Sequence, residues 1–123
     1  MKQIVYIGLD GDSIGREIER NIINNNLQDL RSFSHCITKA IEIIRDLVES
    51  NSGDVIFYGG DSILFSGSFD EIFAQKIIDI FRSETNRTAS VGIGNSPHET
   101  YLGLKLAKSY GGNRFIYFKK KDL

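Results

Sequence analysis

The sequence predicts an α+β domain of the ferredoxin-like class, with the element order βααββαβαβ and a mainly antiparallel sheet on which helices pack. Three observations predict this class. Short apolar runs typical of strands alternate with longer stretches in which apolar residues recur at helical spacing. Two of the strand-like runs flank the pair Gly59-Gly60, which is a hairpin signal. Without the second helix and the final helix–strand pair, the order is βαββαβ, the split βαβ arrangement.

The composition is that of one globular domain spanning residues 1–123. Hydrophobic residues make up 41% and charged residues 25% of the chain, and the net charge is −1. Long nucleic acid is not an expected partner, because its binding needs clustered positive charge. The single cysteine, Cys36, cannot form an internal disulfide. The N-terminal residues have the pattern of neither a signal peptide nor a membrane span, so we expect a cytoplasmic protein without a membrane partner.

The first strand leads into an acidic turn. A nearly continuous apolar run over residues 3–9 predicts a strand that is buried on both faces and therefore central. It ends in the sequence Asp10-Gly11-Asp12-Ser13-Ile14-Gly15. Asp12 or Ser13 is expected to cap a helix that runs to about Asn24, and capping alone is one explanation for Asp12.

The remaining elements follow from similar signals. A long helix over residues 27–50 has one apolar stripe. Ser68 and Glu71 have the spacing of a capping box, with Ser68 as the N-cap of a third helix. A second capping box, Ser96 to Glu99, begins a fourth helix that ends near residue 110. The other predicted strands cover residues 54–58, 62–66, 90–94 and 113–118.

The predicted topology brings two acidic residues together. A right-handed crossover makes the first and second strands parallel, and in this fold the third strand lies between them, antiparallel to both. The end of the first strand then lies beside the beginning of the third. We therefore expect Asp10 and Asp61 to meet at one edge of the sheet, next to a glycine turn and a helix N-terminus.

Such a group of residues suits metal and phosphate chemistry. Crowded carboxylates repel each other unless a cation neutralises them, and oxygen ligands suit Mg²⁺ or Mn²⁺, whereas no Cys/His set has the spacing of a zinc site. The helix N-terminus favours a phosphate, Gly59 and Gly60 leave room for a nucleotide, and Lys108 and Arg114 can balance a triphosphate. These features are typical of two-metal nucleotidyl transfer, although an ordinary Gly-Gly hairpin explains the turn taken alone.

The motifs resemble those of palm-domain nucleotidyl cyclases and polymerases. The residues that carry this resemblance are Asp10-Gly11-Asp12 and Tyr58-Gly59-Gly60-Asp61. Residues 90–94 and 107–114 are similar to the SIGIA…AKxxGRNR pattern of GGDEF diguanylate cyclases. The fullest resemblance, over essentially the whole chain, is to the minimal CRISPR polymerase (mCpol) family, which carries a GGDD motif and a DGDxIG-like first turn. This family resemblance implies synthesis of a cyclic nucleotide second messenger from ATP in bacterial antiviral defence.

The resemblance also implies roles for individual residues. Asp10 and Asp61 match the catalytic, metal-binding acids, and the carbonyl of Gly11 matches a backbone ligand of Mg²⁺ or Mn²⁺. Asp12 matches the second acid of the first motif, and Lys108 matches a lysine that binds the triphosphate. The implied nucleotide-binding residues are Asp12, Ser13, Ile14, Gly15, Gly59, Gly60, Ser62, Lys108 and Arg114.

Three positions depart from the related patterns. Ser62 stands where GGDEF proteins have Glu and GGDD proteins have Asp, so one acid of the second motif is missing. Gly112 stands where the GGDEF pattern has Arg. Ile18 stands where diguanylate cyclases have a guanine-reading Asn. This last difference favours ATP over GTP, because an apolar side chain leaves the polar groups of guanine unsatisfied.

The favoured hypothesis is a cyclase that joins two nucleoside triphosphates into a cyclic dinucleotide. One palm presents one nucleotide, so joining two implies a homodimer with facing active sites. The alternatives are a GTP cyclohydrolase-like or mononucleotide cyclase enzyme on the same palm, or a catalytically weak nucleotide-binding sensor, for which the missing acid at Ser62 argues.

Overall fold

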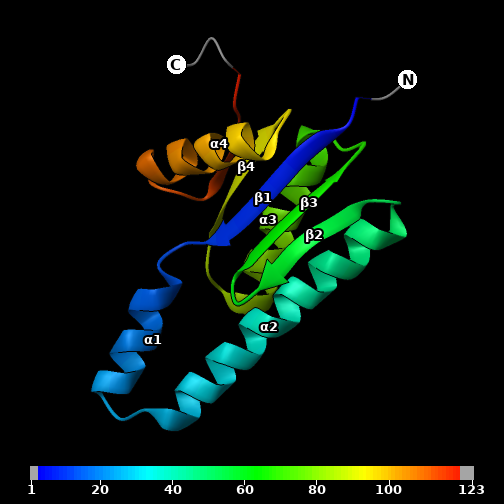
Figure 1. Ribbon diagram of the computed structural model, residues 1–123. Coiled ribbons are helices and arrows are strands. Elements are labelled where there is room, and N and C mark those ends of the chain that lie inside the picture. Colours follow the sequence, from blue (N-terminus) through cyan, green and yellow to red (C-terminus); the bar gives the residue numbers. More distant parts are fainter. Residues whose placement is uncertain (1–2, 120–123) are drawn as a thin grey trace.

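The computed structural model describes residues 3–119 and contains the expected sequence of helices and strands (Figure 1). The elements are β1 (Val5–Gly11), α1 (Ile14–Ile23), α2 (Leu27–Ser50), β2 (Asp54–Gly59), β3 (Ser62–Gly67), α3 (Glu71–Thr85), β4 (Ala89–Gly94), α4 (Pro97–Ser109) and β5 (Arg114–Tyr117).

The five strands form one mixed sheet in the order β2-β3-β1-β4-β5. β3 lies between β2 and β1 and is antiparallel to both, and β4 is antiparallel to β1. β4 and β5 are parallel, as a crossover through α4 requires. The predicted α+β class, the central first strand and the place of the third strand are therefore confirmed.

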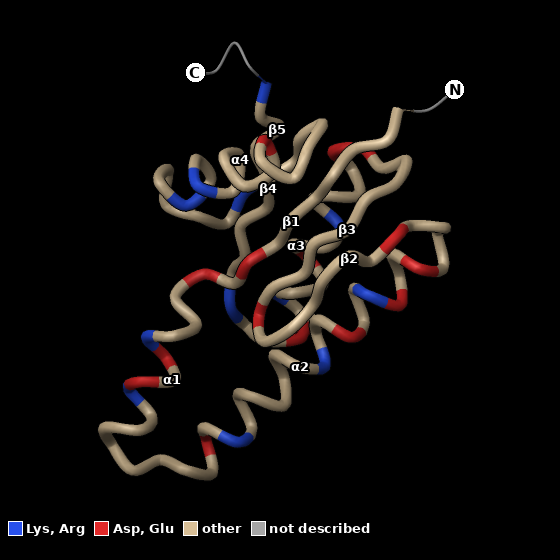
Figure 2. Tube along the Cα trace, viewed as in Figure 1, with Lys and Arg blue, Asp and Glu red and all other residues tan. Residues whose placement is uncertain are grey.

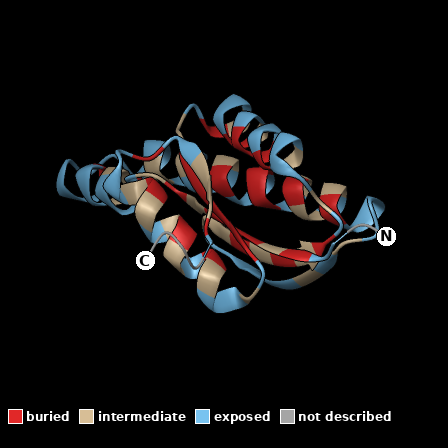
Figure 3. Ribbon diagram, turned by 90° about the horizontal axis from the view of Figure 1, so that it is seen from above, coloured by how far each residue is buried: buried red, intermediate tan, exposed pale blue. Residues whose placement is uncertain are grey.

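Helices cover both faces of the sheet. α2 and α3 lie against one face and α4 against the other (Figure 1). Viewed from above, the buried residues line the inner sides of the layers and the outer faces are exposed (Figure 3). Because side chains alternate along a strand, β1 directs Val5, Ile7 and Leu9 into the core between the sheet and α2 and α3. The next residue, Asp10, faces the α4 side at the end of the same strand.

α4 lies unusually close to the sheet because β4 carries glycine where the helix crosses it. A Cβ atom on Gly92 would overlap the backbone of Thr100 and Leu104 in α4. No side chain larger than hydrogen fits there, so the helix backbone rests directly on the strand. This contact fixes the distance between β4 and the middle of α4.

α1 projects from the body of the molecule (Figure 1). Its buried residues are Ile14 and Asn21, while Ile22 and Ile23 are 56% and 69% exposed. Ile14 packs beside the end of β1, and the rest of the helix packs mainly against α2. This helix is therefore held by fewer apolar contacts than the other three.

Two predicted boundaries are wrong. β1 continues through Asp10 and Gly11, because it is paired with strands on both sides there. The two residues of the hairpin turn are Gly60 and Asp61 rather than Gly59 and Gly60, since Gly59 is the last residue of β2. Only one of these two glycines, Gly60, has a positive φ (56°).

The predicted capping box at Ser68 is also wrong. Asp70 is the N-cap of α3, and its carboxylate accepts a hydrogen bond of 3.0 Å from the Phe73 N–H. Phe69 lies just before the helix, and its ring packs against Phe65, with centroids 5.2 Å apart. At the start of α4 the prediction of Ser96 as N-cap is confirmed, since its hydroxyl accepts from the Glu99 N–H.

Candidate active site at the end of the first strand

The sheet register brings the first acidic motif to the hairpin. Asp10 pairs with Ser62 across the β1–β3 ladder, and the Gly11 N–H donates to the Asp61 carbonyl at 3.1 Å. A Cβ on Gly11 would lie 3.1 Å from the Asp61 Oδ2 atom. Acidic segments at the end of β1 and in the β2–β3 turn lie at the same end of the sheet (Figure 2). Two carboxylates that are far apart in sequence thus share one site.

The proximity of the two carboxylates affects the pKa of Asp61. Burial, and then the negative charge of Asp10, raise the pKa of the Asp61 carboxyl above its ordinary value. The negative charge of the Asp10 carboxylate is better compensated, because its Oδ1 accepts a hydrogen bond of 2.7 Å from the Ser62 hydroxyl. The serine that replaces an acid of the second motif therefore supports Asp10 directly.

Lys108 reaches this group of oxygens from α4. Its ammonium group lies 2.8 Å from the Gly11 carbonyl oxygen, 3.3 Å from Asp10 Oδ2 and 3.2 Å from Asp12 Oδ1. The lysine thus contacts two of the three groups predicted as metal ligands, the carbonyl of Gly11 and the carboxylate of Asp10. These oxygens form a place where a positive charge is stabilised.

The donor set fits a hard divalent cation. The Asp10 and Asp61 carboxylates and the Gly11 carbonyl offer oxygen atoms alone, the ligand type that Mg²⁺ and Mn²⁺ prefer. Within residues 3–119, no group of three or more Asp, Glu, His or Cys side chains could hold a metal ion. A metal at this site would have two carboxylates at most, which is usual for Mg²⁺ that is also bound by substrate phosphates.

Asp12 has a different environment from the other two acids. Its side chain is 15% exposed and accepts hydrogen bonds from the Thr88 hydroxyl, the Ser90 hydroxyl and the Asn113 N–H. Burial opposes its ionisation, but these bonds and the one from Lys108 outweigh burial and lower the pKa of Asp12. The carboxylate therefore ties the β1–α1 turn to β4 and to the start of β5.

A shallow hollow lies beside this turn. Asp12, Ser13, Lys108, Gly111 and Gly112 line an open space of about 190 Å³, which we call the phosphate hollow. Ser13 is the N-cap residue of α1, but its φ is 58° and its side chain makes no capping hydrogen bond. The first N–H groups of α1 are therefore not capped by that side chain.

Three other predicted residues lie around this site. A Cβ on Gly15 or on Gly60 would have no heavy atom within 4 Å, so the backbone is open at both places. Arg114 is exposed, and its Nε donates to the Gly112 carbonyl at 3.0 Å. Its guanidinium lies 5.8 Å from the Tyr110 ring centroid rather than over the phosphate hollow.

A second hollow lies on the other side of Asp61, between α1 and α2. It has a volume of about 110 Å³, and we call it the α1–α2 hollow. Its walls are Ile14, Ile18, Phe33, Ser34, Ile37, Thr38, Gly60 and Asp61. The structure therefore brings Ile18, which was singled out from the motif pattern, next to the acidic turn.

Sequence reasoning did not identify several of these residues. Ser34 and Thr38 in α2 add hydroxyl groups to the α1–α2 hollow, and Thr88 holds Asp12. The sequence feature that could have identified Ser34 and Thr38 is their position directly after the apolar residues Phe33 and Ile37. No local pattern points to Thr88, because its role depends on the path of the loop between α3 and β4.

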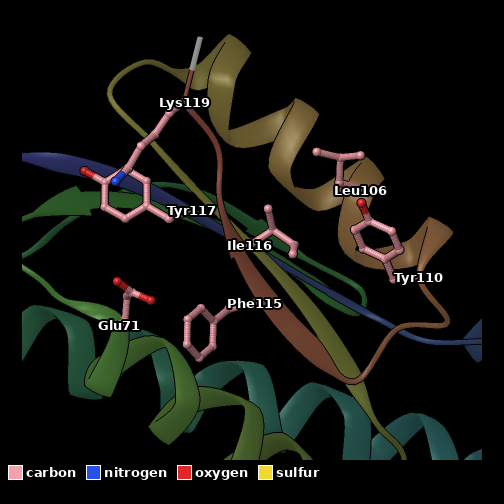
Figure 4. A pocket seen from close by; sticks show the side chains of 7 residues that line it. All are labelled: Glu71, Leu106, Tyr110, Phe115, Ile116, Tyr117 and Lys119. Carbon is pink, nitrogen blue, oxygen red and sulfur yellow. The ribbon is translucent and has the colours of Figure 1, made fainter. Parts of the chain in front are cut away.

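A cavity larger than either of these hollows lies elsewhere among the described residues. A space of about 530 Å³ lies along β5, between the start of α3 and the end of α4 (Figure 4). It is lined by Glu71, Leu106, Tyr110, Phe115, Ile116, Tyr117 and Lys119. None of the residues predicted for nucleotide or metal binding lines this cavity.

Comparison with known families and with curated proteins gives two results. The family model of the minimal CRISPR polymerase domain, mCpol, matches residues 6–118. No curated protein matches the chain. Within residues 3–119, no helix has the length and apolar character needed to cross a membrane.

Several solved structures have a similar fold. A chain of the Csm1-Csm4 cassette in complex with pppApA matches with a TM-score of 0.74 and 20% identity, over 90% of this chain and 20% of that chain. The chain thus spans about a fifth of that relative. The active GGEEF domain of a diguanylate cyclase from Vibrio cholerae has a TM-score of 0.60 and 13% identity, covering 95% of this chain and 83% of that one. The GGDEF domain of DgcB from Caulobacter crescentus in complex with c-di-GMP has a TM-score of 0.58 and 15% identity, covering 94% and 77%.

Proposed function

Because the chain belongs to the minimal CRISPR polymerase (mCpol) family of palm-domain cyclases and polymerases, we propose that it is a metal-dependent nucleotidyltransferase. Its proposed product is a cyclic dinucleotide made from ATP, and the proposed role of this second messenger is antiviral defence. One observation carries the proposal: Asp10 and Asp61 lie side by side with the Gly11 carbonyl, within reach of Lys108.

In this proposal Asp10, Asp61 and the Gly11 carbonyl hold Mg²⁺ or Mn²⁺. In the two-metal scheme, one ion held by these residues would lower the pKa of an attacking hydroxyl, and the other would stabilise the charge of the leaving pyrophosphate. The contacts of Lys108 support the fit, because they show that these oxygens accept a cation at hydrogen-bond distance. The raised pKa of Asp61 supports it as well, since a second carboxylate beside Asp10 is costly without added positive charge.

Each of the two hollows binds a different part of the substrate. The triphosphate occupies the phosphate hollow, where Lys108 and the N–H groups at the start of α1 bind its oxygens. The base occupies the α1–α2 hollow, and the reacting α-phosphate lies between them at Asp10 and Asp61. Asp12 keeps the turn in place through Thr88 and Ser90.

The reaction is two successive phosphoryl substitutions. A ribose hydroxyl oxygen of one ATP bonds to the α-phosphorus of the other, the bond from that phosphorus to the β-phosphate oxygen breaks, and pyrophosphate leaves. The proton of the hydroxyl passes to solvent. A second substitution in the opposite direction closes the ring and releases a second pyrophosphate, which requires two nucleotides held face to face and hence a homodimer.

The proposed preference for ATP rests on the lining of the α1–α2 hollow. Ile18 provides no hydrogen bond for the O6 or N2 groups of guanine. Each unsatisfied polar group that is buried costs about 1–3 kcal/mol. Among the side chains that line the hollow, Ser34 and Thr38 offer hydroxyls to the amino group of adenine, while the Asp61 carboxylate is assigned to the metal.

A product assay tests the proposal. The protein is incubated with ATP, with GTP and with both, in Mg²⁺ or Mn²⁺, and the products are resolved by mass. We expect a cyclic dinucleotide and pyrophosphate from ATP, with a lower kcat/KM for GTP. The Asp61→Asn variant serves as the control for a contaminating activity, because it keeps the size of the side chain and removes its charge.

Other products would contradict the proposal in distinct ways. Formate or a ring-opened base from GTP would indicate cyclohydrolase chemistry, and a cyclic mononucleotide would indicate an intramolecular reaction. Binding of ATP without any turnover would indicate a nucleotide sensor. A kcat/KM for GTP at or above that for ATP would contradict the base preference and leave the metal site intact.

A further inference from the structure

Arg87 contacts both helices that form the α1–α2 hollow. It lies in the loop between α3 and β4, outside every motif discussed above. Its guanidinium forms an ion pair with Glu17 of α1, and its Cζ lies 5.8 Å from the centroid of the Phe33 ring in α2. One side chain thus joins two helices that meet at the hollow.

The backbone of Arg87 is itself held in place. Its N–H donates to the Thr85 hydroxyl at 3.0 Å, and that hydroxyl donates to the Phe81 carbonyl at 2.7 Å. The next residue, Thr88, holds Asp12. The loop is therefore anchored on both sides of Arg87, so the guanidinium extends from a fixed point.

α1 needs such a contact more than the other helices do. Few of its residues are buried, and the residue that Arg87 contacts is directly before Ile18, which lines the hollow. Glu17 also pairs with Arg20 at 2.8 Å, but Arg20 lies on the same helix and is 66% exposed. The Arg20 pair stays within α1, whereas the Arg87 pair connects α1 to the body of the molecule.

We propose that Arg87 is a positioning residue that fixes the spacing between α1 and α2 and thereby sets the affinity for the nucleobase. It acts on one wall through Glu17 and Ile18, and on the other through Phe33, which lines the hollow. The proposal rests on the proposed function, because it takes the α1–α2 hollow as the base site. In this proposal Arg87 does not contact the phosphates of the nucleotide.

The test separates base binding from phosphate binding. Dissociation constants for ATP and for inorganic tripolyphosphate, each with Mg²⁺, are measured by calorimetry for the wild type and for Arg87→Ala. We expect binding of ATP to weaken by about tenfold, a loss of the size that one displaced wall of a pocket produces. Binding of tripolyphosphate is expected to stay unchanged, because Lys108 and the start of α1 are not altered.

Three further variants sharpen the result. Arg20→Ala removes the other partner of Glu17 and is expected to bind ATP like the wild type. Arg87→Lys keeps the positive charge toward Glu17 without the flat guanidinium over Phe33, and we expect intermediate affinity. Glu17→Gln removes the ion pair from the α1 side, so it tests the same link if Arg87→Ala does not fold.

The kinetic expectation is a higher KM for ATP with kcat nearly unchanged, the pattern of lost uniform binding. Equal weakening of ATP and tripolyphosphate, or unchanged ATP binding in both Arg87→Ala and Glu17→Gln, would overturn the inference. If the folded wild type bound ATP no more tightly than tripolyphosphate, the α1–α2 hollow would not be a base site. The inference on Arg87 would then be overturned as well. A wild type that binds ATP but forms no product would contradict the proposed function and leave the inference on Arg87 standing.

Discussion

Asp61 is the residue on which the proposed chemistry depends most directly. Replacing it by Asn removes one negative charge from the proposed metal ligands with almost no change in volume. We expect turnover of ATP by Asp61→Asn, and likewise by Asp10→Asn, to fall at least about a hundredfold, because charge stabilisation by a metal is worth several kcal/mol. Near-normal metal-dependent turnover in either variant would contradict the proposed metal site.

The same Asp61→Asn change is expected to stabilise the metal-free protein at neutral pH. The folded pKa of Asp61 is raised above the unfolded value of 3.8, so the stability that this group contributes is present below 3.8 and is lost as the pH rises through the folded pKa. At neutral pH the fold therefore carries an unfavourable charge that Asn lacks. We expect a melting temperature about 2–5 °C higher, the shift that about 1 kcal/mol gives in a small domain.

Thermal denaturation in chelating buffer at several pH values measures this effect. The gain is expected to shrink as the pH falls below 3.8, where Asp61 is protonated in both states. Added Mn²⁺ is expected to stabilise the wild type more than the variant. A variant that melts below the wild type at neutral pH would contradict the inference that the ionised Asp61 carboxylate destabilises the metal-free fold.

Asp12 is expected to respond in the opposite direction. Its folded pKa is lowered, so its contribution to stability is present above the unfolded value of 3.8 and is lost as the pH falls through the folded pKa. We expect Asp12→Asn to lose about 1–3 kcal/mol at neutral pH, because hydroxyl donors at Thr88 and Ser90 lose their carboxylate. Urea denaturation at neutral pH and near pH 3.5 measures the difference, which should become smaller at the lower pH.

The exposed Asp29 in the first turn of α2 provides a matched control for this substitution. Asp29→Asn removes the same charge without breaking the contacts of Asp12, and we expect its stability to stay close to that of the wild type. Equal losses in the two variants would mean that net charge, rather than the bonds of Asp12, is responsible.

Lys108 is expected to bind triphosphate rather than stabilise the fold. We expect Lys108→Ala to reduce the rise in melting temperature that Mg-ATP produces, because the variant lacks the cation of the phosphate hollow. The alternative is a lysine that interacts with the C-terminus of α4, worth about 0.3–1 kcal/mol. Lys105→Ala is the control, since Lys105 lies on the same helix but has its ammonium group 5.5 Å from the Tyr101 ring centroid. Equal ATP-induced shifts in the wild type and Lys108→Ala would support the alternative.

Individual site residues differ in how well the sequence predicts them. Asp10 and Asp61 were expected to meet because strand pairing follows from topology, and the sheet register places them together. The hydroxyls of Thr88 and Ser90 that donate to Asp12 and the hydroxyls of the α1–α2 hollow were not expected. Their positions depend on the rotation of α2 and on the path of one loop, and neither is encoded in a local pattern.

At the scale of elements, the packing of α4 on the sheet determines where Lys108 lies in the site. The middle of α4 rests on Gly92, and the helix carries Lys108 near its C-terminal end. We expect Gly92→Ala to destabilise the protein by about 1–3 kcal/mol or more, the usual cost of overpacking. ATP turnover should fall further than stability alone explains, because a displaced helix moves Lys108 away from Gly11.

Gly15→Ala is the matched control for stability. A Cβ at Gly15 would have no heavy atom within 4 Å, and alanine favours a helix over glycine by up to about 1 kcal/mol. We expect this variant to be as stable as the wild type or more stable in thermal denaturation. A Gly92→Ala protein as stable as Gly15→Ala would contradict the close packing of α4.

Element boundaries were predictable where one signal dominates. The bounds of α2 follow from its apolar stripe and the polar residues that flank it, and the structure confirms 27–50. β1 was predicted too short because Asp10 and Gly11 look like turn residues, yet strands on both sides extend the ladder. At α3 the side chain of Asp70 caps the helix, and local spacing alone does not distinguish it from the capping box predicted at Ser68.

At the scale of the whole molecule, the proposed chemistry requires two copies of the chain. Mixing the wild type with excess Asp61→Asn is therefore expected to suppress cyclic product. With three parts variant to one part wild type, random pairing leaves about one wild-type chain in four with a wild-type partner. Turnover per wild-type chain should fall to about a quarter, and a linear dinucleotide should accumulate. Turnover that stays proportional to the wild-type concentration would contradict the need for facing sites.

The strand order has a consequence for how chains can associate. β2 and β5 are the outer strands of the sheet, and unpaired strand edges are the usual templates for aggregation. The β2 register shifts between Val55 and Phe57, and Arg45 of α2 donates to the Tyr58 hydroxyl at 2.9 Å on the same strand. β5 is short, spanning Arg114–Tyr117. Both edges thus have features that discourage continuous strand-to-strand growth, which favours association of this chain through its faces over open-ended fibres.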